Sequence, residues 1–260
     1  MLKTIRQRGS KAKLPFSLVF APFLAIMALL SISALRSHIL RTQSMFSYSS
    51  ITKIFGGNGR ELNVDLAIRN APVVTKELSL QGSFDSIEQF GCFDIEWSPA
   101  DKPSLTLRAQ EHVLPMMDVF VHNGTLVVRS KPGNLVSTER ILVIATSPSV
   151  KRAKISGAGD IELAGVSSPS LAVHIQGSGD ILVSGQVRDL SVDIVGSGDF
   201  EGMALAAQNA RLNIAGAGDI RVKVAQDVEA QVRGSGDILV HGGAGKRNTR
   251  VMGAGDIRFI

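Results

Sequence analysis

The sequence is poor in cysteine, in aromatic residues and, over its first 60 positions, in acidic residues. Its only cysteine, Cys92, cannot form an intramolecular disulfide or a zinc site made of several cysteines. Aromatic residues make up 5% of the 260 positions, so few side chains are available as flat platforms for sugar rings. The chain is nevertheless 44% hydrophobic and only 20% charged, which excludes a wholly disordered protein.

The net charge of +5 is unevenly distributed. Residues 1–60 contain nine basic and no acidic side chains, whereas residues 61–260 contain 19 basic and 23 acidic ones, a net of −4. The main part of the chain is therefore mildly acidic. We expect no nucleic-acid partner, because such a partner requires a basic surface.

The N-terminal segment predicts export. Residues 14–35 carry no charge and are long enough to cross a bilayer as a helix, which takes about 20 residues. Five basic residues precede them, so residues 1–13 are expected in the cytoplasm and the rest in the periplasm or outside the cell. The protein is then anchored to the inner membrane by this helix. A cleaved signal peptide, which releases a secreted protein, is the alternative. Residues 36–77 are interpreted as a linker.

A short motif recurs six times in the C-terminal part. G-[AS]-G-D ends at Asp160, Asp180, Asp199, Asp219, Asp237 and Asp256, at spacings of 18–20 residues. Aligned on the aspartate, the copies share an apolar residue one position after it and another five positions before it, such as Ile161 and Ile155. Residues between these positions are mixed and polar. This alternation with a period of two predicts β-strands.

A strand of this length cannot bury its apolar face alone, so the copies are expected to stack about 4.8 Å apart. The sequence lacks the long helical periodicity of an α/β fold. It therefore predicts an all-β protein, a parallel β-helix (β-solenoid) with coils of about 19 residues over 151–260. Residues 78–150 are interpreted as the irregular, capping start of the same domain, 78–260. Asn123-Gly124 predicts a hairpin within it.

Three segments carry a family resemblance: FDSIEQFGCFDIEW, then PSLTLRAQEHVLPMMDVFVHNGTLVVRSK, then units like SGAGDIELAG. In this order they closely resemble the bacterial GIN head domain family of auto-transporter adhesins over residues 82–260. The resemblance implies a right-handed β-helix outside the cytoplasm. It implies no catalytic residue and no cofactor.

The six motif aspartates, Asp160, Asp180, Asp199, Asp219, Asp237 and Asp256, are the first candidate site. Stacked in register, their carboxylates would lie about 5 Å apart and repel one another. One interpretation is structural, with each carboxylate accepting hydrogen bonds from turn amides. The other is a ladder of cation sites, because hard cations prefer carboxylate oxygens. No residue is assigned as an established metal ligand.

The second candidate is a polar row on the outside of the solenoid. Lys154, His174 and Asp193 would lie on adjacent coils with Arg211 beside them. They represent either an ordinary solvated face or the site of a β-helix polysaccharide lyase or hydrolase, which needs convergent acid–base groups.

Two further expectations concern single places in the chain. Cys92, between Phe90 and Phe93, is expected to be a core or cap thiol, with intermolecular pairing as the alternative. The C-terminal strand is expected to leave a solenoid edge open, so residues 247–260 could mediate end-to-end self-association. The best-supported function is a non-catalytic, exported solenoid of the bacterial envelope, acting as a structural, adhesion-type or protein-interaction module on an unknown protein or envelope polymer.

Overall fold

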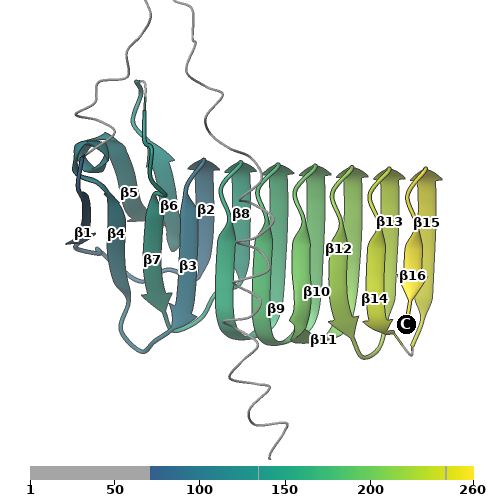
Figure 1. The fold of residues 1–260 in the computed structure, drawn as a ribbon. Coiled ribbons are helices and arrows are strands. Elements are labelled where there is room, and N and C mark those ends of the chain that lie inside the picture. The colour runs from purple at the N-terminus through teal and green to yellow at the C-terminus, as the bar shows by residue number, and fades with distance from the viewer. Residues whose placement is uncertain (1–70, 134, 244) are drawn as a thin grey trace, which may run out of the picture. The chain divides into compact units, whose positions relative to one another are not determined.

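The computed structural model describes residues 71–133, 135–243 and 245–260, which form an all-β solenoid (Figure 1). The first strands are β1 (Val73–Glu77), β2 (Ser86–Gly91), β3 (Asp94–Pro99), β4 (Ser104–Gln110), β5 (Met117–His122), β6 (Thr125–Ser130), β7 (Leu142–Ser147) and β8 (Arg152–Gly157). The 3-10 helix η2 (Glu111–Met116) lies between β4 and β5. The remaining strands are β9 (Ile161–Gly177), β10 (Ile181–Gly196), β11 (Phe200–Gly216), β12 (Ile220–Val224), β13 (Val228–Gly234), β14 (Ile238–Gly242), β15 (Arg247–Gly253) and β16 (Ile257–Phe259).

The coils place two parallel sheet faces back to back. Face 1 holds the strand directly after each motif aspartate: β3, the first parts of β9, β10 and β11, then β12, β14 and β16. Face 2 holds the strand directly before each motif: β2, β8, the last parts of β9, β10 and β11, then β13 and β15. Figure 1 shows these strands side by side in chain order from β8 to β15.

The register confirms the stacking predicted from the repeat. On face 1, Ile181 pairs with Ile161 of the preceding coil and with Phe200 of the following one. On face 2, Ile194 pairs in the same way with Ile175 and Ile214. Like residues therefore lie on like residues from coil to coil.

The core fills the narrow space between the two faces. Ile161, Ile175, Ile181 and Phe200 are at most 1% exposed, and they come from alternate positions of their strands, as the alternation predicts. Burying an aliphatic side chain of this size contributes about 1.5–3 kcal/mol. Several such residues per coil offset much of the conformational entropy that ordering the coil costs.

The N-terminal part is irregular and mixes strand directions. β1 pairs antiparallel with β4, β4 pairs antiparallel with β7, and β5 and β6 form an antiparallel hairpin. The hairpin turns at Asn123 and Gly124, which have φ values of 50° and 73°, as the Asn-Gly signal predicts. β1 lies inside the segment interpreted as a linker, because three β-branched residues, Val73, Val74 and Thr75, favour a strand there.

The glycines of the motif are needed because the turns stack closely. Gly196 has a φ of +133°, which favours glycine, and a Cβ on Gly198 would clash with the carbonyl oxygen of Gly179 one coil earlier. The same backbone contact recurs at each later copy of the motif. The repeat therefore encodes close packing of one turn on the next.

The predicted basic region 1–13, the apolar segment 14–35 and the linker up to residue 70 lie outside the described residues. Over residues 71–133, 135–243 and 245–260, no helix has the length and apolar character that crossing a membrane requires.

We predict that Gly198→Ala lowers the stability of the solenoid by about 3 kcal/mol, because the new methyl group overlaps backbone that cannot move aside. The matched control is Ser197→Ala, since Ala and Ser alternate naturally at that exposed position of the motif. Chemical denaturation of the two variants measures the difference. Equal stability of both variants would contradict the close-stacking role of the second glycine.

Candidate functional site

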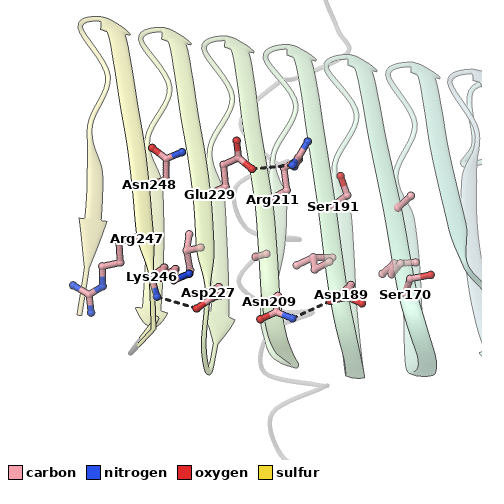
Figure 2. A pocket seen from close by; sticks show the side chains of 15 residues that line it. Ser170, Asp189, Ser191, Asn209, Arg211, Asp227, Glu229, Lys246, Arg247 and Asn248 are labelled. Carbon is pink, nitrogen blue, oxygen red and sulfur yellow. Dashed lines mark hydrogen bonds and ion pairs between the residues drawn. The ribbon is translucent and has the colours of Figure 1, made fainter.

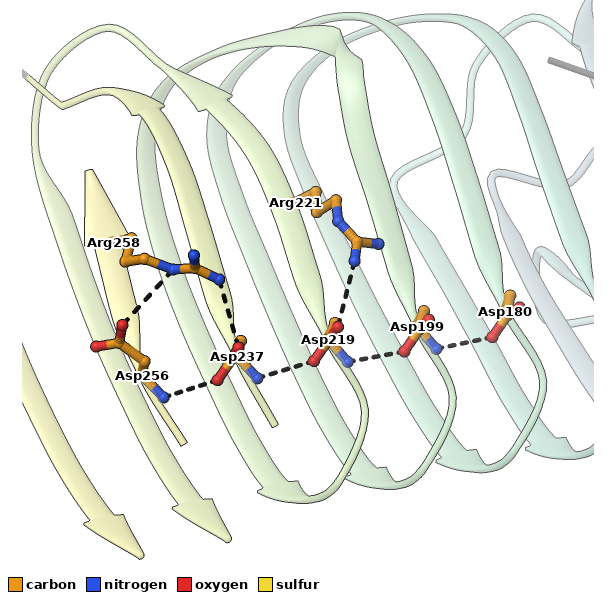
Figure 3. Close-up of polar contacts among 7 residues, drawn as sticks. All are labelled: Asp180, Asp199, Asp219, Arg221, Asp237, Asp256 and Arg258. Carbon is orange, nitrogen blue, oxygen red and sulfur yellow. Dashed lines mark hydrogen bonds and ion pairs between the residues drawn. The ribbon is translucent and has the colours of Figure 1, made fainter. Parts of the chain in front are cut away.

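The motif aspartates form a continuous hydrogen-bonded ladder along one corner of the solenoid (Figure 3). Oδ1 of Asp160 accepts the backbone N–H of Asp180 at 2.9 Å, and Oδ1 of Asp180 accepts that of Asp199 at 2.8 Å. The same bond joins each later pair at 2.8–2.9 Å, up to the N–H of Asp256. Each carboxylate from Asp160 to Asp237 thus binds an amide of the next coil, rather than one of its own turn.

Asp94 begins this ladder, and sequence reasoning missed it. Its Oδ1 accepts the backbone N–H of Asp160 at 2.9 Å, and the following residue, Ile95, pairs with Ile161. The signal was present as Gly91-Cys92-Phe93-Asp94, in which the second motif glycine is replaced by Phe93. Among the described residues, no motif turn precedes that of Asp94. A side chain at Phe93 therefore meets no backbone of an earlier turn, and glycine is not required at this position. We call Asp94, Asp160, Asp180, Asp199, Asp219, Asp237 and Asp256 the aspartate ladder.

Basic side chains and amides reduce the repulsion along the aspartate ladder. Arg140 binds Asp94, Arg221 lies 3.3 Å from the carboxylate of Asp219, and Arg258 lies 3.4 Å from that of Asp237. Asp180 forms no such ion pair with any residue that the structure describes. Burial raises its pKa to about 6, the charges of Asp160 and Asp199 add to this effect, and the bond from the Asp199 amide opposes it.

The ladder geometry supports a structural role for these carboxylates. One oxygen of each carboxylate from Asp160 to Asp237 already accepts an amide of the next coil, and one oxygen of Asp256 accepts the amide of Ile257. In the part of the chain that the structure describes, no group of three or more His, Cys, Asp or Glu side chains is arranged to hold a metal ion. The cation ladder stays an untested prediction.

The predicted outer row is assembled on face 2. Lys154, His174 and Asp193 lie on neighbouring strands in direct register. The next member, Asn213, donates its Nδ2 to Oδ1 of Asp193 at 2.8 Å. Arg211 lies in the adjacent row and forms an ion pair with Glu229 at 2.9 Å. The four predicted residues therefore share one face, and three of them form a straight line along the solenoid.

A groove crosses the start of five neighbouring face 2 strands, and only Arg211 of the predicted residues lines it (Figure 2). Its volume is about 1010 Å³. One wall is the row Ser170, Asp189, Asn209, Asp227 and Lys246; the other is the row Ala172, Ser191, Arg211, Glu229 and Asn248. The first row stands ten positions before successive ladder aspartates. This constant distance of ten residues from the aspartate is a sequence signal. It lies further from the aspartate than the strand positions on which the sequence analysis relied.

Hydrogen bonds between coils fix the walls of this groove. Asn209 donates its Nδ2 to Oδ1 of Asp189 at 2.9 Å, and the backbone N–H of Lys246 donates to Oδ1 of Asp227 at 2.8 Å. The bond from Asn209, together with the contact from Arg188, lowers the pKa of Asp189. The lining contains three acidic and three basic side chains, so the groove is polar but carries no net charge.

Cys92 was expected in the core or cap, and this prediction is wrong, because the thiol is exposed. Gly91 pairs with Gly157, so Cys92 takes the place of Ala158, the exposed residue between the two motif glycines. Phe90 is also 36% exposed, and the Lys154 ammonium lies 5.7 Å from the centroid of its ring.

The fold and the ladder define a protein of the parallel β-solenoid class with a polar outer face. The family model for "Putative auto-transporter adhesin, head GIN domain" matches residues 83–244. The chain belongs to this family.

One solved structure supports the fold. A "putative adhesin" from Bacteroides fragilis superposes with a TM-score of 0.61 at 20% identity, over 73% of this chain and 97% of that one. A second, from Parabacteroides distasonis, gives a TM-score of 0.49 at 17% identity, over 74% and 98%. No curated protein matches the sequence.

We predict that Asp180→Asn stabilises the protein at pH 7.5 and not at pH 4. The folded-state pKa of about 6 lies above the ordinary value of 3.8, so the folded state binds more protons between these values and loses stability as the pH rises through them. Asparagine keeps the Oδ1 acceptor without the charge. Because the side chain of Asp180 is only partly buried and still reaches solvent, screening limits the gain to about 1 kcal/mol, or about 2–4 °C in Tm.

The control for this measurement is Asp101→Asn, in an exposed loop outside the aspartate ladder. Thermal melts at both pH values test the prediction. A loss of stability at pH 7.5 would contradict it. A melting temperature of the wild type that rises in millimolar Ca²⁺ relative to EDTA would instead support the cation ladder.

Proposed function

We propose that this protein is an exported, non-catalytic, adhesion-type module that holds an extended envelope polymer or protein partner on face 2. The observation that supports this most directly is the groove. Its two polar rows repeat in register on five neighbouring strands. Parallel strands place equivalent side chains about 4.8 Å apart, so an extended partner can meet a hydrogen-bonding side chain of the first row on each coil.

Such a surface gains affinity by adding many weak contacts. A single hydrogen bond contributes only about 0.5–1.5 kcal/mol net, but the rows offer several at fixed positions. The bonds between Asn209 and Asp189 and between Arg211 and Glu229 hold these side chains in place before a partner arrives. Less side-chain entropy is then lost on binding.

The arrangement of the predicted outer row favours binding over catalysis. General acid–base catalysis needs two or more groups aimed at one reacting atom. Lys154, His174 and Asp193 are spread one per strand along a straight row, and the carboxylate of Asp193 accepts a bond from Asn213. The lyase or hydrolase function remains the alternative, and the following measurement separates the two.

We expect full-length protein, purified in detergent, to be retained by at least one of three polymers: peptidoglycan, pectin and alginate. Ser191→Trp fills the groove and should weaken this binding about tenfold, the loss of roughly one good contact. Leu182→Trp, on the solvent side of face 1, should have no effect. Unchanged polymer binding by the Ser191→Trp variant would contradict the proposal that the polymer binds in the groove. Product release from a polymer, abolished by His174→Ala or Asp193→Ala, would favour the lyase or hydrolase.

Export is the second part of the proposal. It is supported by the nine basic residues without any acidic residue in positions 1–60 and by the uncharged run 14–35, which together are typical of an anchor or a signal peptide. An N-terminal helix over 14–35, anchored in the inner membrane, and a right-handed sense of the solenoid belong to the same proposal.

Fusing a phosphatase that is active only outside the cytoplasm to the C-terminus tests export. We expect activity with the full chain and none after deletion of residues 1–35, because the positive-inside rule directs the rest of the chain outward. The mature N-terminal residue then distinguishes an anchored protein, which begins at Met1, from a secreted one. Activity without residues 1–35 would contradict the role given to this segment.

A further inference from the structure

The last coil presents two strand edges that no described strand covers. β15 pairs only with β13, and β16 pairs only with β14. All seven residues of β15 are exposed. Val251 is 42% exposed, whereas Val232, its register partner one coil earlier, is 0% exposed. A free edge with exposed apolar side chains is a template for pairing with another strand.

The aspartate ladder changes at the same place. From Asp94 to Asp237 each carboxylate accepts the amide of the next ladder aspartate, but Oδ1 of Asp256 accepts the N–H of Ile257 from its own turn, at 2.8 Å. In the last coil, the carboxylate oxygen that would bind the amide of a following coil therefore binds only the amide of its own turn.

The last coil carries a net positive charge. Residues 246–260 contain the basic residues Lys246, Arg247, Arg250 and Arg258 and a single acidic one, Asp256, a net of +3. Residues 71–245 contain 14 basic and 20 acidic side chains, a net of −6. The coil therefore carries a charge opposite to that of the rest of the domain.

Two of these cations have no partner within the described part of the chain. The side chains of Lys246 and Arg250 form no hydrogen bond or ion pair there, whereas Arg247 donates to the carbonyl oxygens of Gly242 and Gly243 and lies over the ring of Phe259, 4.3 Å from its centroid. Arg250 stands at the middle of β15, on its outer side, in register with Gln231. An unpaired cation at the centre of an open strand edge favours an acidic strand as its neighbour.

We propose that the open edge of β15 binds an extended, acidic segment of a partner protein, which adds one strand to face 2. Backbone hydrogen bonds supply the pairing, as in other cases of β-augmentation. A carboxylate of the segment faces Arg250 on the outer side, while apolar residues at the alternate positions cover Val251. The occupant is thus a strand that alternates acidic and apolar residues. This edge adjoins one end of the groove, whose lining includes Lys246, Arg247 and Asn248, but the inference does not rest on the function proposed for the groove.

A second copy of the chain fits this edge less well. Two identical edges meet around a twofold axis, which brings a net charge of +3 against +3 and the arginines of both copies close together. Like charges on opposed strands destabilise their pairing. The end-to-end self-association expected from the sequence is therefore the competing outcome of the experiment.

The test uses full-length protein in detergent and a fluorescent peptide, TEVEVET, followed by fluorescence anisotropy. We expect saturable binding that Arg250→Glu weakens about tenfold, because the change turns attraction at the centre of the strand into repulsion. Arg233→Glu, an equally exposed arginine one coil inward on β13, is the matched control and should change affinity less than threefold. The peptide TQVQVQT should bind at least tenfold more weakly.

Backbone pairing is tested separately from charge. A TEVEVET peptide N-methylated at alternate residues keeps its carboxylates but loses edge-facing donors, and we expect it not to bind. Equal binding of this peptide, or an equal loss with Arg233→Glu, would overturn the proposal in favour of diffuse attraction. A dimer seen by light scattering that TEVEVET cannot dissociate would assign the edge to self-association. Ser191→Trp should bind TEVEVET normally, so failure of the groove and failure of the edge are distinguishable.

Discussion

Every described coil of the repeat depends on the close contact between one G-x-G-D turn and the next. A Cβ at either glycine would overlap the backbone of the preceding turn, so the coils can approach to strand-pairing distance only where both side chains are absent. The aspartate that follows uses this proximity, because its carboxylate reaches the amide of the next coil. The turn thereby fixes register: aliphatic residues lie on aliphatic residues, and a slip by one position would expose them.

This constraint separates structure from function within each coil. The corner and the inward positions have little freedom, because they must repeat. The outward positions of face 2 carry serine, aspartate, asparagine, arginine and glutamate in changing order, and they are free to vary. A solenoid therefore presents a regular frame whose outer rows can be adapted to a partner without disturbing the core.

Charge follows the same division. The negative charges of the ladder carboxylates are offset by backbone amides and by arginines such as Arg140, Arg221 and Arg258, so the ladder supports the stacking of the coils. The groove lining has no net charge. The last coil, where strand edges are open, carries a cationic excess. The two proposed binding surfaces thus differ in chemistry: a neutral polar face along the coils and a basic edge at their end.

The sequence alone determined the repeat, the strands and their inward rows, because a period of two and a fixed motif spacing report backbone geometry directly. It also brought Lys154, His174 and Asp193 to one row, since register follows from the spacing. Only the tertiary structure decided that Asp94 starts the ladder, that ladder bonds cross between coils, that Cys92 is exposed and that the groove runs along the row of Asp189 and Asn209. Each of these features depends on which atoms of separate coils come into contact. The pattern of residues along the chain does not contain the distances between such atoms.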